Sequence, residues 1–195
     1  MAGGLQVWTV GHSNHPLERF VDLVRSASIE VVADVRSQPY SRHNQHFNQA
    51  PLRAALAGAG LRYAFLGEEL GGRPREPWMY DQEGHVLYGE VARSARFREG
   101  IERVRRGAAS WRVALMCSEE DPTGCHRRLL IARVLREEGI GVVHLRGDGS
   151  TIDDEDLTAT AGAEQPSLFA PGGEASWRSV RSVSPGTRPR SSSDR

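Results

Sequence analysis

Two cysteines, a histidine and two arginines lie close together in residues 115–128, the segment of the chain best suited to chemistry. Cys117 ends an apolar run that predicts a buried strand, while Cys125, His126 and Arg127 begin a helical pattern. A helix start carries unpaired N–H groups and partial positive charge, which favour a thiolate or a bound anion. We therefore expect reactive chemistry or anion binding in this segment.

Two further loops rich in polar side chains each follow a predicted strand. Their candidate residues, together with Glu119 of the cysteine segment, are His12, Ser13, Asn14, Asp34, Arg36 and Ser41. In a parallel α/β sheet, ligands bind beyond the carboxyl ends of the strands. The three loops are therefore expected to meet at one edge of a sheet and to line one site.

The hydrophobic pattern around these loops alternates between strands and helices. Strands are expected at residues 5–10, 31–35, 61–66, 113–116 and 142–145, and helices from 17, over 51–59, over 97–106 and from near 125. The residues between 67 and 85 are expected to form a long polar loop. The order predicts an α/β fold: one domain over residues 1–150, with an open, mostly parallel sheet of about five strands and helices on both faces.

Residues 151–195 are expected to be a flexible, disordered tail, because they carry too little apolar surface to fold alone. Within this tail, residues 165–169 resemble the short peptide by which bacterial replication and repair proteins dock on the DNA sliding clamp. In that interpretation, Gln165 hydrogen-bonds at the rim of a pocket that Leu168 and Phe169 fill. The alternative is that Leu168 and Phe169 fold back onto the domain.

Composition limits the classes of function. The chain has 195 residues, of which 38% are hydrophobic, and no apolar run reaches the roughly 20 residues that span a bilayer. Its first residues lack the features of a signal segment, so we expect a cytoplasmic protein whose cysteines are free thiols. The formal net charge is zero. Every basic side chain is an arginine, which excludes lysine Schiff-base chemistry and a phosphate loop of the Walker type.

Structural roles remain open for the same residues. Both cysteines are also suited to packing as small buried side chains, and Arg36 and Arg127 to a buried ion-pair network with Glu119 and Asp34. The spacing of Cys117, Cys125 and His126 does not match the usual zinc motifs, and it lacks the Cys-x-x-Cys pattern of redox pairs. We predict neither a metal nor a cofactor.

Four segments, taken in order, resemble domain-of-unknown-function family 488: residues 9–14, 34–41, 66–72, and 115–119 with 125–127. The resemblance covers about residues 7–145. It implies an α/β fold and a polar site built from these motifs, but it supplies no reaction. The site residues that it implies are His12, Ser13, Asn14, Asp34, Arg36, Ser41, Cys117, Glu119, Cys125, His126 and Arg127.

The leading hypothesis is an enzyme that acts on DNA or nucleotides, of the hydrolase or glycosidase type used in modified-base repair, and that its tail recruits to the sliding clamp. Its catalytic residues are expected to be Cys117, Asp34, Glu119 and His12. Cys117 is the nucleophile or base reader, and Asp34 or Glu119 is the acid/base.

The substrate is expected to be held by polar and aromatic side chains. Predicted substrate-binding residues are Ser13, Asn14, Arg36, Ser41, Cys125, His126 and Arg127, with Arg42 and Arg128 as further phosphate contacts and Tyr40, Tyr63, His43 and His46 as stacking partners for a base. Two other classes remain open. One is a module that binds a nucleotide or modified base without turnover, and the other is a thiol-redox or metal-binding protein unrelated to DNA.

Overall fold

The computed structural model of the chain describes residues 4–163, 177–183 and 185, and it contains one six-stranded sheet. The strands are β1 (Gln6–Gly11), β2 (Val31–Asp34), β3 (Arg62–Phe65), β4 (Val113–Cys117), β5 (Gly141–Leu145) and β6 (Thr151–Asp153). Their spatial order is β3-β2-β4-β1-β5-β6, and all neighbours are parallel except β6, which runs antiparallel to β5. The predicted α/β fold with a mostly parallel sheet is confirmed.

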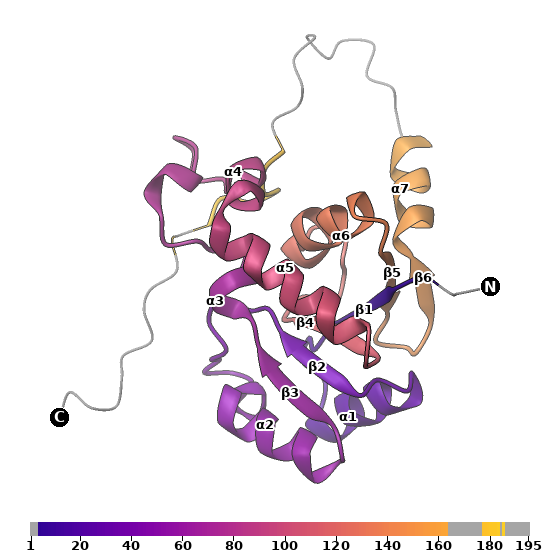
Figure 1. Cartoon of the computed structure of the whole chain (residues 1–195). Helices are drawn as coiled ribbons and strands as arrows, with labels where there is room; N and C mark the ends of the chain where they lie inside the picture. The colour runs from indigo at the N-terminus through magenta and orange to yellow at the C-terminus, as the bar shows by residue number, and fades with distance from the viewer. Residues whose placement is uncertain (1–3, 164–176, 184, 186–195) are drawn as a thin grey trace, which may run out of the picture.

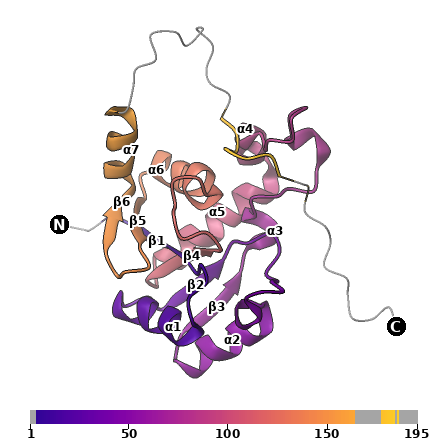
Figure 2. The same cartoon turned by 180° about the vertical axis from the view of Figure 1, so that it is seen from behind.

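Helices cover both faces of this sheet (Figure 1; Figure 2). They are α1 (Leu17–Ser26), α2 (Gln49–Gly58), α3 (Gly67–Leu70), α4 (Tyr88–Arg93), α5 (Ala95–Ala108), α6 (Arg133–Glu137) and α7 (Asp154–Ala163), with 3₁₀ turns η1 (Gln45–Phe47) and η2 (Pro77–Met79) and a π-helical segment η3 (Arg127–Ala132). In the described part of the chain, no helix is long and apolar enough to cross a membrane.

The two faces of the sheet have separate cores because successive side chains of a strand point in opposite directions. In β4, Leu115 and Cys117 pack with the side chains of α4, α5 and α6. Ala114 and Met116 pack on the other face with those of α1 and α2. A strand buried on both sides reads as a continuous apolar run, and for this reason β4 is visible in the sequence.

The segment expected to be a long loop, residues 67–85, contains the short helices α3 and η2. Leu70 and Met79 anchor these two turns in the core. Elements of three or four residues are too short to show a helical period, so the sequence pattern did not reveal them.

The folded domain extends past the predicted boundary at residue 150. Residues 151–153 form β6 on the edge of the sheet, and α7 follows directly. Asp154, which is 1% exposed, accepts a hydrogen bond from His144 at 2.8 Å and pairs with Arg128 at 2.8 Å. These residues were expected to belong to a flexible tail, but the carboxylate of Asp154 is buried and docks α7.

A second part of the predicted tail also packs on the domain. Residues 177–183, here called the C-terminal strap, lie beside α4 and the loop before it (Figure 1). The indole N–H of Trp177 donates to the carbonyl of Leu129 at 2.7 Å, and the N–H of Ser179 donates to that of Val86 at 2.9 Å. The expected flexible tail is thus wrong for residues 151–163 and for the strap. The predicted clamp peptide, with Gln165, Leu168 and Phe169, lies outside the described residues.

Candidate functional site

A cavity of about 600 Å³ lies where the loops after β1, β2 and β4 meet, at the carboxyl ends of these strands. The predicted site residues that line it are His12, Ser13, Arg36, Ser41, Cys117, Glu119 and His126. The three loops therefore converge, as the strand-end rule predicts. Asn14, Asp34, Cys125 and Arg127 do not line this cavity.

Backbone pairing continues beyond β1 and β4 and aligns their two loops. The N–H of His12 donates to the carbonyl of Cys117 and the N–H of Ser13 to that of Ser118, each at 2.9 Å. Gly11 permits this close approach, because a Cβ at its position would lie 1.8 Å from the carbonyl oxygen of Glu119. Residues 11–13 therefore lie directly against the loop that carries Glu119.

Asp34 is a positioning residue rather than a catalytic one. Its carboxylate is fully buried. It accepts hydrogen bonds from Nε of Arg36 at 2.9 Å, from Nη2 of Arg36 at 2.6 Å and from the hydroxyl of Tyr63 at 2.8 Å. A carboxylate whose two oxygens are held this way has no oxygen directed at a substrate. The Asp34–Arg36 pair belongs to the buried ion-pair network that the sequence left open as an alternative. Tyr63, whose hydroxyl is bound to Asp34, lines neither cavity and is not placed to stack on a base.

His12 orients the same arginine. Its ring stacks on Phe47 with centroids 4.2 Å apart, its Nε2 accepts from Nη1 of Arg36 at 3.1 Å, and its Nδ1 donates to the carbonyl of Ser13 at 2.7 Å. Burial first, and then the charge of Arg36, lower the pKa of His12 to about 4. The ring is neutral with both nitrogens engaged, so we assign it positioning, not proton transfer.

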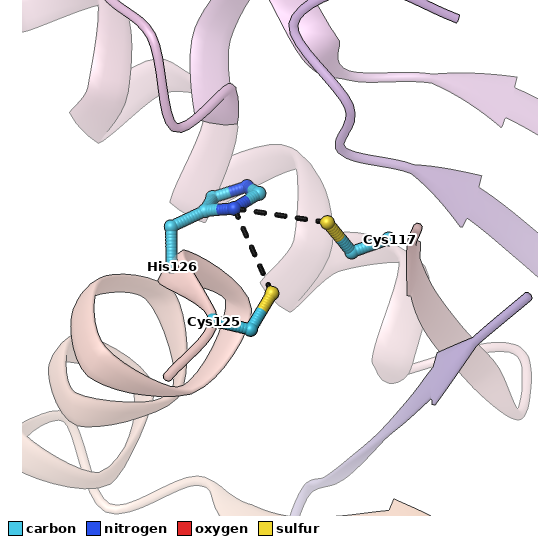
Figure 3. A group of neighbouring side chains, drawn as sticks. All are labelled: Cys117, Cys125 and His126. Atoms are coloured by element: carbon cyan, nitrogen blue, oxygen red, sulfur yellow. Dashed lines mark hydrogen bonds between the residues drawn. The ribbon is translucent and has the colours of Figure 1, made fainter. Parts of the chain in front are cut away.

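Cys117, Cys125 and His126 form a compact cluster on the wall of the cavity (Figure 3). The ring Nδ1 of His126 lies 3.8 Å from each sulfur, and Nε2 lies 3.1 Å from the carbonyl oxygen of Val35. Both cysteines are free thiols, as expected. Two sulfurs and an imidazole nitrogen are donor atoms that could hold a thiophilic metal ion.

The two thiols of this cluster differ in acidity. The pKa of Cys117 lies well below its ordinary value, because Cys125 hydrogen-bonds to its sulfur and the charges of His126 and Arg127 lie nearby. Burial, followed by the hydrogen bond with Cys117, raises the pKa of Cys125. Burial alone would lower the pKa of His126, but the adjacent Cys117 raises it.

Gly72 allows the chain after α3 to pack against the ring of His126. A Cβ at this position would lie 2.6 Å from Cγ of that ring and 2.8 Å from its Nδ1. In the structure, Gly72 is needed because any side chain would displace an imidazole at the centre of the site.

Arg127 supports the loop from behind and does not face a ligand. It is 1% exposed, and its guanidinium donates to the carbonyls of Glu119 and Glu120 and, at 3.4 Å, to the hydroxyl of Thr9. Arg128 is likewise committed to Asp154. The predicted phosphate contacts of these two arginines are therefore not available.

Several lining residues escaped the sequence analysis. They are Ser37, Gln38, Asn44, Gly72, Arg73, Tyr88, Ser118, Gly124 and the strap residues 179–183. Arg42 lines a neighbouring cavity of about 830 Å³, which shares Ser37, Gln38, Tyr40 and Arg73 with the first. His43 and His46 line neither cavity. Residues 67–85 were expected to form a long polar loop, and only the fold brings Arg73 of this segment to the site.

Comparisons with known proteins give one result. The chain matches no curated protein and no solved structure. A family model described as "Domain of unknown function DUF488" matches residues 16–134. This span includes β2, β3, β4 and the cysteine segment, whereas the His12 loop precedes it. Because more than half of the chain is matched, the protein belongs to the DUF488 family, as its motifs predicted.

Proposed function

We propose that this protein is an enzyme that acts on a nucleotide or on a base of DNA, by hydrolysis of the glycosidic type. The observation that carries the proposal is the convergence of three polar strand-end loops on one cavity of about 600 Å³. That volume is within the range of small-ligand sites and suits one nucleotide.

The charges of the cavity favour an anionic ligand. Three lining residues are arginines (Arg36, Arg73 and Arg181), and the acidic lining residue is Glu119. Asp34 neutralises Arg36, whereas Arg73 and Arg181 form no ion pair with a carboxylate in the described part of the chain. Free guanidinium groups bind phosphate well, since their donors match its oxygens in pairs.

An aromatic side chain and a second cavity support a nucleic-acid substrate. Tyr40 is 66% exposed and lines both cavities, so its ring is available to stack on a base. The neighbouring cavity adds Arg42 and offers room for a flanking nucleotide. A strand of DNA whose target base has left the stack would fit this arrangement.

Glu119 is the residue best suited to acid/base work. In the proposed reaction, its carboxylate takes a proton from water as the oxygen attacks the anomeric carbon of the sugar. The bond from this carbon to the base nitrogen breaks, its electron pair leaves with the base, and Glu119 returns the proton to that nitrogen. Water is consumed, and the sugar and the free base are the products.

We expect Glu119→Gln to lower the rate of base release by about 10²–10⁴-fold, because the amide cannot accept the proton. The measurement is base release from oligonucleotides that carry a panel of modified bases. Asp121→Asn is a matched control, since Asp121 lies two residues away and does not line the cavity. Equal rates for parent and Glu119→Gln would refute the role of Glu119.

Complete inactivity of the parent across a broad panel would refute the enzymatic proposal. Recovery of unchanged ligand from a stable complex would then identify the chain as a binding module. Binding and turnover can be measured separately, because Arg73, Arg181 and Tyr40 would bind the ligand whether or not it reacts.

We also propose that residues 165–169 dock on the DNA sliding clamp, which would place the enzyme on DNA in the cytoplasm. The support is the order of side chains in the sequence, with glutamine first and a Leu-Phe pair last. In a pull-down with purified clamp, the parent should be recovered and Leu168→Ala/Phe169→Ala should not. Equal recovery of both proteins would exclude this peptide as the docking element.

A further inference from the structure

The side chain of His126 is oriented as a metal ligand would be. Its Nε2 lies 3.1 Å from the carbonyl oxygen of Val35, and a carbonyl accepts only, so Nε2 must carry the proton. In the neutral ring, which is the form that binds metal, the lone pair of Nδ1 is then directed toward the sulfurs of Cys117 and Cys125 (Figure 3). Metal-binding histidines commonly donate their second nitrogen to a backbone carbonyl in this way, which fixes the tautomer and the ring.

The distances among the three donors suit a tetrahedral ion. Zinc with sulfur ligands at about 2.3 Å and nitrogen at about 2.0–2.1 Å separates neighbouring donors by roughly 3.6 Å. The structure has 3.8 Å from Nδ1 to each sulfur, and all three donors lie within 4.8 Å of one another. The Nδ1-to-sulfur distances would need to shorten by a few tenths of an ångström, and the two sulfurs, which lie within 4.8 Å of each other, would need to approach by up to about 1 Å.

Two elements hold these donors rigidly. Cys117 ends β4, which is buried on both faces, and Cys125 with His126 opens the helix that continues into η3. The spacing between the cysteines is unusual for zinc motifs because the loop 118–124 lies between them. The backbone of this loop is held by Arg127, so the separation in sequence does not become a separation in space.

The surroundings leave one side of the cluster open. Cys117 and His126 line the cavity, while Cys125 lies behind them. Within the described residues, the cluster contains no fourth histidine, cysteine or carboxylate. A three-ligand site with a fourth position toward a cavity is the arrangement of catalytic rather than structural zinc.

We propose that Cys117, Cys125 and His126 bind one thiophilic divalent ion of the zinc type, with its fourth position open to the cavity. Its catalytic meaning rests on the proposed function, because the open position faces the same space as Glu119. Metal binding itself does not depend on that function. The assignment gives Cys117 the role of a ligand instead of a nucleophile.

The test is the metal content of the full chain, purified without chelator and measured by elemental analysis. We expect about one zinc per chain, loss of this metal to a chelator, and its return on addition of Zn²⁺. Replacement by Co²⁺ should give thiolate-to-cobalt charge-transfer absorption. Cys125→Ser and His126→Gln should each weaken Zn²⁺ binding at least about tenfold.

The controls separate this proposal from loss of fold and from failure of the proposed function. His43→Gln changes an exposed histidine outside both cavities and should bind Zn²⁺ as the parent does. Glu119→Gln should keep its metal even though it loses activity. If metal binds and no base is released from any substrate, the proposed function fails and the metal site stands.

Two results would overturn the metal site. One is a folded parent with two titratable thiols that binds neither Zn²⁺ nor Co²⁺, which would return Cys117 to the role of a nucleophile. The other is a protein whose thiols become titratable only after reduction, since the two sulfurs would then be a redox pair. Base release by metal-free protein would show that the proposed reaction does not need the ion.

Discussion

Asp34→Asn should be strongly destabilising, with a loss of about 3–5 kcal/mol in the free energy of unfolding. The substitution keeps the shape of the side chain but leaves the guanidinium of Arg36, which is 6% exposed, without its counter-charge. For a domain of this size, such a loss corresponds to a fall of about 10 °C in Tm. Thermal and denaturant unfolding of parent and variant would measure it.

Two companion variants test the cause. Tyr63→Phe removes one hydrogen bond to Asp34 but no charge, and should cost about 1 kcal/mol. Asp22→Asn changes an exposed carboxylate of α1 and should leave the unfolding free energy within about 0.5 kcal/mol of the parent. An Asp34→Asn protein as stable as the parent would show that the buried ion pair does not hold the β2 loop.

Asp154→Asn should weaken the domain by about 3 kcal/mol at neutral pH, because Arg128 and Arg136 both lose their common anionic partner. Burial alone would raise the pKa of Asp154, but the hydrogen bond from His144 and the charges of the two arginines lower it below the ordinary 3.8. A carboxyl with a lowered pKa stabilises the fold above its ordinary pKa, and this contribution is lost as the pH falls through the native value.

The difference between parent and Asp154→Asn should therefore be present above the ordinary pKa of 3.8 and shrink at pH values below it. Denaturant unfolding at a series of pH values would record it. Glu155→Gln, in the exposed position next along α7, should show no such difference. A gap that does not shrink as the pH falls well below 3.8 would contradict a native carboxylate at Asp154.

Most of the parallel part of the fold could be predicted because four of its strands, β1, β2, β4 and β5, are largely buried on both faces. Runs such as 113–116 carry that signal in consecutive residues. β6 and α7 do not, since β6 is held by backbone pairing with β5, and the buried contact of α7 is a charged residue, Asp154, whose partner His144 lies on another strand. The strap was missed for a similar reason, because Ser179 pairs with Val86 from a distant part of the chain.

The sequence predicted which loops form the site, but not the role of each residue within it. Strand-end position brought His12, Arg36 and Cys117 to one cavity, as expected. The same reasoning could not separate residues that face the cavity from those that build it. Arg127 is of the residue type expected in an anion site, yet its guanidinium donates to the carbonyl oxygens of Glu119 and Glu120. Contacts with backbone carbonyls leave no pattern in the sequence of side chains.

The strap has a further consequence for the proposed docking of residues 165–169 on the clamp. Helix α7 ends at Ala163, and the indole N–H of Trp177 donates to the carbonyl of Leu129. A docking peptide at 165–169 would then be tethered at both ends, with a reach of at most roughly 3.3–3.6 Å per residue from either anchor. A protein held in this way would stay within nanometres of the DNA that the clamp encircles, so its effective concentration there would be high without any direct affinity for the duplex.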